Sequence, residues 1–274
     1  MAAVALPTMA QQTVKVISQD AKQHENTVCD TARYRIWYQA EVVQNAKDEQ
    51  QKTVIKEPMR LDIGTRIAHF YSETAHLSDS LNEVLKAKGE TRFISKGRFY
   101  WHVYSNYPRT GMSVFLDKID FALERGKCEE EMEAIDWQLL PDSTRNILGY
   151  DCHLAQADFK GRTWQAWYAD DVPLEYGPWK LGGLPGLILM AYDTEHHYTF
   201  TASAMITFQT PEPIVYNDAA YEPYSRKELN ELQKRFHADP VGFMSQDPQA
   251  QVIVQDEHGN PAKSYSLPYN PIER

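Results

Sequence analysis

The sequence lacks the short motifs that commonly mark an enzyme active site. It contains no GxSxG nucleophile elbow, no HExxH metal pair, no Walker loop and no GxGxxG dinucleotide fingerprint. Cysteine is scarce, with 3 residues in 274, and no CxxC pair occurs. This scarcity argues against a zinc ribbon or a thioredoxin-like redox site. We therefore expect no cofactor.

Long apolar runs and an excess of positive charge are also missing. No stretch approaches the roughly 20 consecutive apolar residues that a membrane-spanning helix needs. The chain has 38 acidic residues against 28 basic ones, a formal charge of −10. Such a balance repels nucleic acid phosphates and anionic lipid head groups, so we expect no nucleic acid partner. Because long apolar runs are missing, we also expect no membrane span. A hydrophobic content of 42% is that of an ordinary folded protein.

The first residues resemble the end of a secretory signal peptide. Residues 1–10 are apolar and small, although the expected basic segment is missing because the first lysine is Lys15. We favour a signal peptide remnant, and a periplasmic or secreted protein, over an ordinary frayed terminus. In an oxidising compartment Cys29, Cys128 and Cys152 allow one disulfide and one free thiol, and the sequence does not choose among the three pairings.

The chain predicts a mainly β fold (β-rich α+β), because many short apolar segments alternate with turn residues. We expect a curled antiparallel meander sheet or half-barrel, with one or two helices covering part of a face. The expected strands are 34–43, 54–61, 63–72, 92–107, 111–121, 149–157, 163–168, 187–192 and 198–208.

Two segments carry the spacing of amphipathic helices. The first, residues 78–88, would be capped by Ser78 or Ser80. The second, residues 225–237, opens with a serine followed three positions later by a glutamate, which is a capping box. The second is the better supported of the two helices.

The domain organisation changes in character after residue 209. Residues 11–209 are predicted to form one β-rich domain, and 210–274 a Pro-rich connector, a helix and an extension that packs on the same domain. Beyond residue 239 we expect loosely held structure. The acidic run 129–133 is predicted to be a solvated turn and not a cation site.

The most sharply specified stretch is residues 177–190, GPWKLGGLPGLILM. Its central tetrapeptide, residues 184–187, fits a type II turn, in which Pro185 fixes φ at the second position and Gly186 supplies a positive φ at the third. The apolar residues that follow predict a buried strand. Because the glycines precede a strand and not a helix, they are unsuited to cradle a phosphate.

Two groups of polar residues near this stretch are candidates for chemistry. Asp170, Asp171 and Glu175 would serve a hydrolase as general acid or base, although aspartates in a turn also bond their own backbone in solvent. His196 and His197 would form a transition-metal site only if the hairpin turn brought both imidazoles together, since adjacent residues in a strand point to opposite faces. The other histidines weighed, expected to be structural or surface residues, are His69, His76, His102 and His153.

Aromatic side chains are concentrated in two parts of the chain. They would either line a groove for a lipid, peptide or sugar, or fill the core of a β protein. The aromatic candidates for lining such a groove are Tyr100, Trp101, Trp164, Trp167, Tyr168 and Trp179.

A family resemblance rests on the order of motifs between residues 135 and 208. The chain resembles the GLPGLI family, exported proteins of the Bacteroidetes named for that hexapeptide. The resemblance implies a bacterial source, export and a β-rich fold, and it implies no activity, cofactor or catalytic residue. The motif residues are Gly177, Pro178, Gly183, Leu184, Pro185, Gly186, Leu187 and Ile188. They are flanked by Trp137, the run 144–147, the run 149–152, Ala155, Gly161, Arg162, the run 166–168, Pro173 and the ending 270–273.

Two hypotheses from different classes follow. The first is an exported non-enzymatic protein that binds or carries an apolar small molecule or peptide, or that contacts a protein partner of the cell envelope. The alternative is a hydrolase that uses carboxylates beside the GLPGLI stretch.

Overall fold

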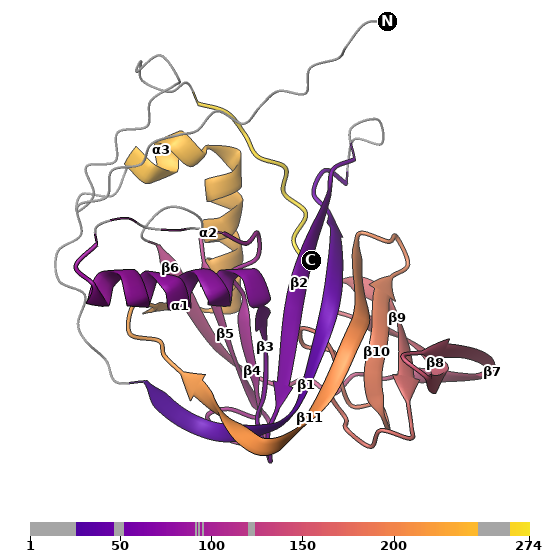
Figure 1. The fold of residues 1–274 in the computed structure, drawn as a ribbon. Helices are drawn as coiled ribbons and strands as arrows, with labels where there is room; N and C mark the ends of the chain where they lie inside the picture. Colours follow the sequence, from indigo (N-terminus) through magenta and orange to yellow (C-terminus); the bar gives the residue numbers. More distant parts are fainter. Residues whose placement is uncertain are drawn as a thin grey trace, which may run out of the picture.

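The computed structural model describes residues 26–46, 52–90, 92, 94, 96–119, 124–245 and 264–274. The signal peptide predicted at residues 1–10 lies outside them. Within the described residues the chain is mainly β, with one open sheet of 12 strands and few helices (Figure 1). The expected fold class is confirmed.

The sheet consists of two antiparallel meanders that meet in its centre. The first runs outward from β1 to β6, and the second enters at the opposite edge with β7 and returns to β11, which pairs with β1. Only the two-residue β12 is parallel to its neighbour, β6. The strands are β1 (Thr27–Val43), β2 (Val54–Ile63), β3 (Ala68–Ser72), β4 (His102–Ser105), β5 (Met112–Lys118), β6 (Arg125–Glu131), β7 (Gln138–Ile147), β8 (Tyr150–Phe159), β9 (Arg162–Ala169), β10 (Leu187–Asp193), β11 (Tyr198–Tyr216) and β12 (Glu222–Pro223).

In the described part of the chain three helices accompany the sheet: α1 (Glu73–Ala87), α2 (Arg226–Ala238) and α3 (Pro240–Ser245). The predicted capping box of α2 is present, with Ser225 and Glu228 bonding each other's backbone. The predicted start of the first helix is wrong, because Ser72, the last residue of β3, caps α1 by accepting a hydrogen bond from the amide of Ala75. The strand therefore passes directly into the helix.

Successive residues of the strands divide between two cores. Phe70 and Val103 join the large core, which contains side chains from both meanders and from α2, whereas Tyr104 joins a smaller core on the opposite face. We call the face that carries the large core the inner face. The aromatic stretch before β4 forms no strand, so the strand expected at 92–107 is reduced to four residues.

Two other boundaries differ from the sequence prediction. The acidic run is not a turn, because β6 continues through Glu131 and pairs with β5. The connector expected from residue 210 begins later, because β11 runs to Tyr216 beside β1. In both places a neighbouring strand satisfies the backbone of a segment whose own composition disfavours a strand.

The end of the chain is also more firmly held than predicted. Ile272 and Glu273 are buried, at 6% and 7% exposure, and Ile272 belongs to the large core. Loose structure beyond residue 239 is therefore wrong for these residues.

All three cysteines lie in the described part of the chain and are free, so none of the three pairings forms. In the same part, no helix has the length and apolar character that crossing a membrane requires.

Candidate functional site

The GLPGLI stretch is a buried connection between β9 and β10. The type II turn predicted for it is wrong in its central feature, since Gly186 does not have a positive φ; Gly183 does, at +79°. Gly186 is required for a different reason. A Cβ atom on it would lie 2.0 Å from the carbonyl oxygen of Ala169, so the two backbone segments approach as closely as only glycine allows.

The apolar side chains of this stretch are part of the large core. Trp179 is 1% exposed and packs against Phe159 and Trp164. The carbonyl of Ile188 accepts a 2.7 Å hydrogen bond from the hydroxyl of Tyr38 in the central strand. The other buried residues of the stretch are Leu181, Leu184, Leu187 and Leu189. The stretch therefore ties the second meander to the first.

Lys180 is the one ionisable residue of the stretch, and no sequence motif indicates its role. Its Nζ contacts carboxylates from two distant parts of the chain, Glu130 of β6 and, at 2.6 Å, Glu273. Arg226 of α2 contacts the same two carboxylates, at 3.2 and 3.6 Å. We call these four residues the Lys180 cluster.

The Lys180 cluster lies mostly out of solvent. The side chains of Lys180 and Glu273 are 7% and 8% exposed. Burial alone raises the pKa of Glu130, but Lys180 and Arg226 lower it by more, so its pKa lies below the ordinary value. Both cations also lie over the ring of Phe115. A carboxylate and an ammonium that stabilise each other's charged forms in this way hold parts of the fold together and are not free to act as a general acid or base.

Two hollows adjoin the Lys180 cluster. One, of about 30 Å³, holds little more than a water molecule and is lined by residues that include Ser113, Glu130 and Lys180. The other, of about 440 Å³, opens at the surface between β6 and the start of α2, where Lys127 and Glu129 form part of its wall. The first is too small for an organic ligand, and the second is lined mainly by polar surface.

None of the aromatic candidates lines either of these two hollows. Tyr100 is half-buried beside the ammonium of Lys118. The others are at most 9% exposed and belong to the large core; they are Trp101, Trp164, Trp167, Tyr168 and Trp179.

The acidic candidates lie at the surface. Asp170, Asp171 and Glu175 are all exposed. Asp170 lies 3.7 Å from Nε2 of His153, whose other ring nitrogen is buried without a hydrogen-bond partner. This carboxylate and imidazole lie close together at the surface of the molecule.

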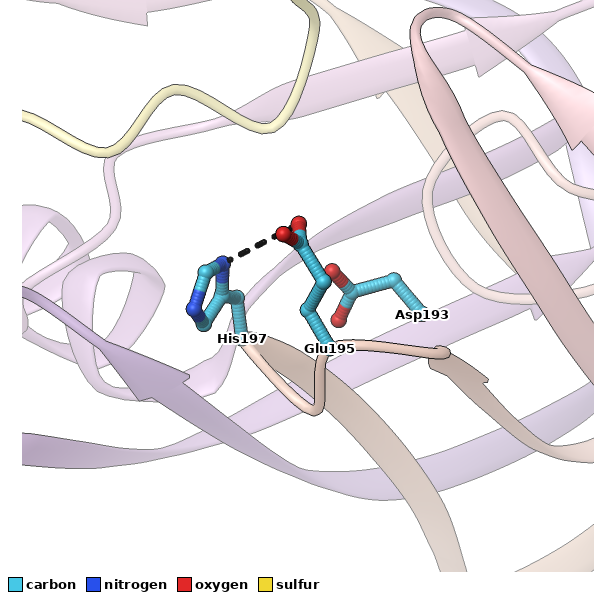
Figure 2. A group of neighbouring side chains, drawn as sticks. All are labelled: Asp193, Glu195 and His197. Carbon is cyan, nitrogen blue, oxygen red and sulfur yellow. Dashed lines mark ion pairs between the residues drawn. The ribbon is translucent and has the colours of Figure 1, made fainter. Parts of the chain in front are cut away.

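The hairpin between β10 and β11 brings together Asp193, Glu195 and His197, with ligand atoms within 4.8 Å of one another (Figure 2). His196 is not part of this group and stacks on Tyr192 instead. The two adjacent histidines therefore take separate roles.

Two arginines already neutralise this group. Asp193, 1% exposed, receives a 2.7 Å hydrogen bond from Arg162, and Arg274 contacts Glu195 at 2.5 Å and Nδ1 of His197 at 3.0 Å. The hydrogen bond from Arg274 lowers the pKa of Glu195. The donor set suits a divalent metal in type, but its charge is balanced by guanidinium groups.

A histidine pair on the other face of the sheet could not be foreseen, because its members are far apart in sequence. Nε2 of His69 lies 3.0 Å from Nδ1 of His102, and the His69 ring stacks between Tyr71 and Tyr104. Burial lowers the pKa of His102 to about 4 and that of His69 well below its ordinary value. Both rings are therefore neutral near pH 7.

Comparison with known proteins gives a family match and several similar solved structures. Residues 128–217 match the family described as "N-glycanase peptide, N-terminal domain". Two crystal structures of PNGF-II, in space groups P21 and C2, are each 14% identical to the chain, with TM-scores of 0.49 and 0.47. They cover 76% and 74% of this chain, which spans about a third of their length (34% and 33%). No curated protein matches the chain in sequence.

Proposed function

We propose that this chain is an exported, non-enzymatic interaction protein that binds a macromolecular partner through its surface. The observation that carries the proposal is the filling of the inner face by aromatic side chains, α2 and the terminal segment. Pockets for drug-sized apolar ligands are about 300–1,000 Å³ and mostly apolar. The small hollow beside Lys180 and the polar surface hollow fit such a ligand poorly.

The edge strand β7 supports a protein partner. It is the last strand of the sheet, most of its residues are exposed, and among the described residues no strand pairs with its outer side. An extended segment of another protein can add to such an edge through main-chain hydrogen bonds. Leu139, 49% exposed, would supply apolar contact there.

Export is part of the same proposal and rests on the composition of residues 1–10 and on the GLPGLI resemblance. It is tested by expressing the full chain in a bacterium of the kind that the resemblance implies. We expect the protein in the periplasmic or secreted fraction, with an N-terminus at Gln11. A cytoplasmic protein that retains Met1 would contradict export.

A second candidate partner is an N-linked glycopeptide, favoured by the match of residues 128–217 to the N-terminal domain of an N-glycanase. Here too the chain would bind and not cleave, because its acidic candidates are exposed and unsheltered.

The test of a non-enzymatic role is a comparison of the wild type with the triple variant D170N/D171N/E175Q. Both are incubated with an N-glycopeptide and with an unglycosylated peptide; binding is followed by calorimetry and products by mass spectrometry. We expect no cleavage by either protein and equal binding by both. Cleavage that the triple variant loses would establish the hydrolase alternative instead.

A further inference from the structure

The terminal segment, residues 270–274, lies in a socket built by side chains from distant elements. Arg162 of β9 is its centre, with a side chain that is completely buried. Its Nε donates to the carbonyl of Ile272 at 2.9 Å, and its Nη2 donates to the carbonyl of Pro271 and to the side chain of Asn270. One guanidinium thus binds two consecutive main-chain carbonyls and the side chain of the residue before them.

Other groups hold the ends of the segment. The hydroxyl of Tyr198 donates to the carbonyl of Asn270, whose side chain donates to the carbonyl of Val43 at 2.7 Å. At the far end, the amide of Arg274 donates to the carbonyl of Lys160 at 3.0 Å. These are the contacts by which a protein recognises an extended peptide.

The side chains of the segment supply a specific sequence pattern. Ile272 enters the large core, and Glu273 enters the Lys180 cluster. Arg274 contacts Glu195 and His197 at the rim. A neighbouring glycine, Gly161, leaves room for it, since a Cβ there would lie 2.7 Å from the Cβ of Arg274.

The inner part of the socket has one more cation than anion until Glu273 is present. Its buried part contains the cations Arg162, Lys180 and Arg226, and the anions Asp193 and Glu130. Glu273 is the carboxylate that completes the balance. Leaving a partly buried cation unpaired is costly, so the socket selects an acidic side chain at this position.

The segment is joined to the body of the protein by few apolar contacts. Residues 264–270 belong to no strand or helix, and 264–266 are exposed. Ile272 is the one fully apolar side chain among residues 270–274 that is buried in the core. Release of the segment breaks no strand pairing, because residues 264–274 belong to no strand, and it removes one apolar side chain from the core, so it is a local opening distinct from unfolding of the sheet.

We propose that this socket is a peptide-binding site and that residues 270–274 are its resident ligand. The ligand class is an extended peptide with an apolar residue followed by glutamate and then a basic residue. This inference rests on the proposed function and names the chemistry of its partner: a partner segment of this pattern displaces the resident one.

The experiment uses the full chain and a fluorescent peptide with the sequence of residues 268–274, PYNPIER. Fluorescence anisotropy measures its binding to the wild type and to the variant I272S, in which the resident segment is weakened. A tethered segment competes at an effective concentration on the order of millimolar. We therefore expect at least tenfold tighter binding to I272S than to the wild type.

The matched control is the same peptide with glutamine in place of the residue equivalent to Glu273. It leaves the protein unchanged, and we expect at least a tenfold loss of affinity for I272S. If I272S loses its native circular dichroism, R274A, which alters only the rim contact, takes its place. Absence of peptide binding to a folded weakened variant, or equal binding of both peptides, would overturn the inference. Either result would leave the proposed function intact, because partner binding at the β7 edge does not involve this socket.

Discussion

Among the described glycines, Gly186 has the least room for any larger side chain. Replacing it with alanine places a Cβ against the backbone of Ala169, which cannot move without disturbing β9. We expect a loss of about 3 kcal/mol in the free energy of unfolding. Urea denaturation of G186A and G183A measures the difference. Gly183 has a positive φ but open space around it, so G183A should lose only about 1 kcal/mol. An unchanged G186A would refute the close-approach account.

The buried histidine pair predicts a pH dependence of stability. In the folded protein His102 has a pKa of about 4, lowered by burial and then by Lys118, whereas in the unfolded chain it is about 6.5. The unfolded state therefore binds more protons between these values. The contribution of His102 is complete above pH 6.5 and is lost as the pH falls toward 4, by up to about 3 kcal/mol.

The measurement is urea denaturation of the wild type and H102Q at pH 7, 6 and 5. The buried carboxyl of Asp117, with a pKa raised by burial to about 7, acts in the opposite direction, so the difference between the two proteins is the informative quantity. We expect the advantage of the wild type to shrink as the pH falls. The exposed residue His196 provides the control, since H196Q should show the wild-type profile. A pH-independent difference between wild type and H102Q would contradict the account.

At the level of single residues, the sequence indicates which positions matter to the fold more reliably than it indicates why they matter. Gly186 was recognised as special, but a close approach to Ala169 is a tertiary contact and leaves no local pattern. The role of Lys180 depends on Glu130 and Glu273, which lie 50 and 93 residues away. The glycines and prolines of the bend are visible in the sequence, whereas the conformation of the bend and the long-range ion pairs are not.

At the level of elements, the N-cap of α1 is Ser72 in the structure, whereas the sequence suggested Ser78 or Ser80. The structure places the cap at Ser72, which also donates a hydrogen bond to Glu57, while Ser80 is exposed within the helix. We expect S72A to lose about 1–2 kcal/mol of stability. S80A should remain within about 0.5 kcal/mol of the wild type. Thermal and urea unfolding of both variants measure this, and the reverse order would return the cap to Ser80.

Elements were predicted best where a local signal agreed with the tertiary environment. The capping box of α2 and the hairpin from β8 to β9 follow from neighbouring residues, and both are present. β6 is not predicted because its acidic run resembles a solvated turn. In the structure the partly buried Glu130 is balanced by cations from other elements. The end of β11 was missed because prolines disfavour a strand, although β1 pairs with it there.

At the scale of the whole molecule, β1 lies in the centre of the sheet, and residues 270–274 pack beside the two meanders that meet there. β1 pairs with β2 on one side and β11 on the other, so the first and last long strands hold the two meanders together (Figure 1). The terminal segment then fills the socket between the meanders. The sequence predicted a β-rich meander and an extension that packs on it, but its polar composition did not indicate the firmly held socket contacts of residues 270–274.

The central claim is that residues 270–274 pack on the inner face and can detach from it while the sheet stays folded. Native-state hydrogen exchange of backbone amides tests this claim most directly. The amides of Leu267 and Arg274 donate to His237 and Lys160. We predict that both are protected, with an opening free energy clearly below that of the amides in β9 and β10. Free exchange of both amides would contradict docking, and exchange only through global unfolding would contradict a segment that a partner displaces.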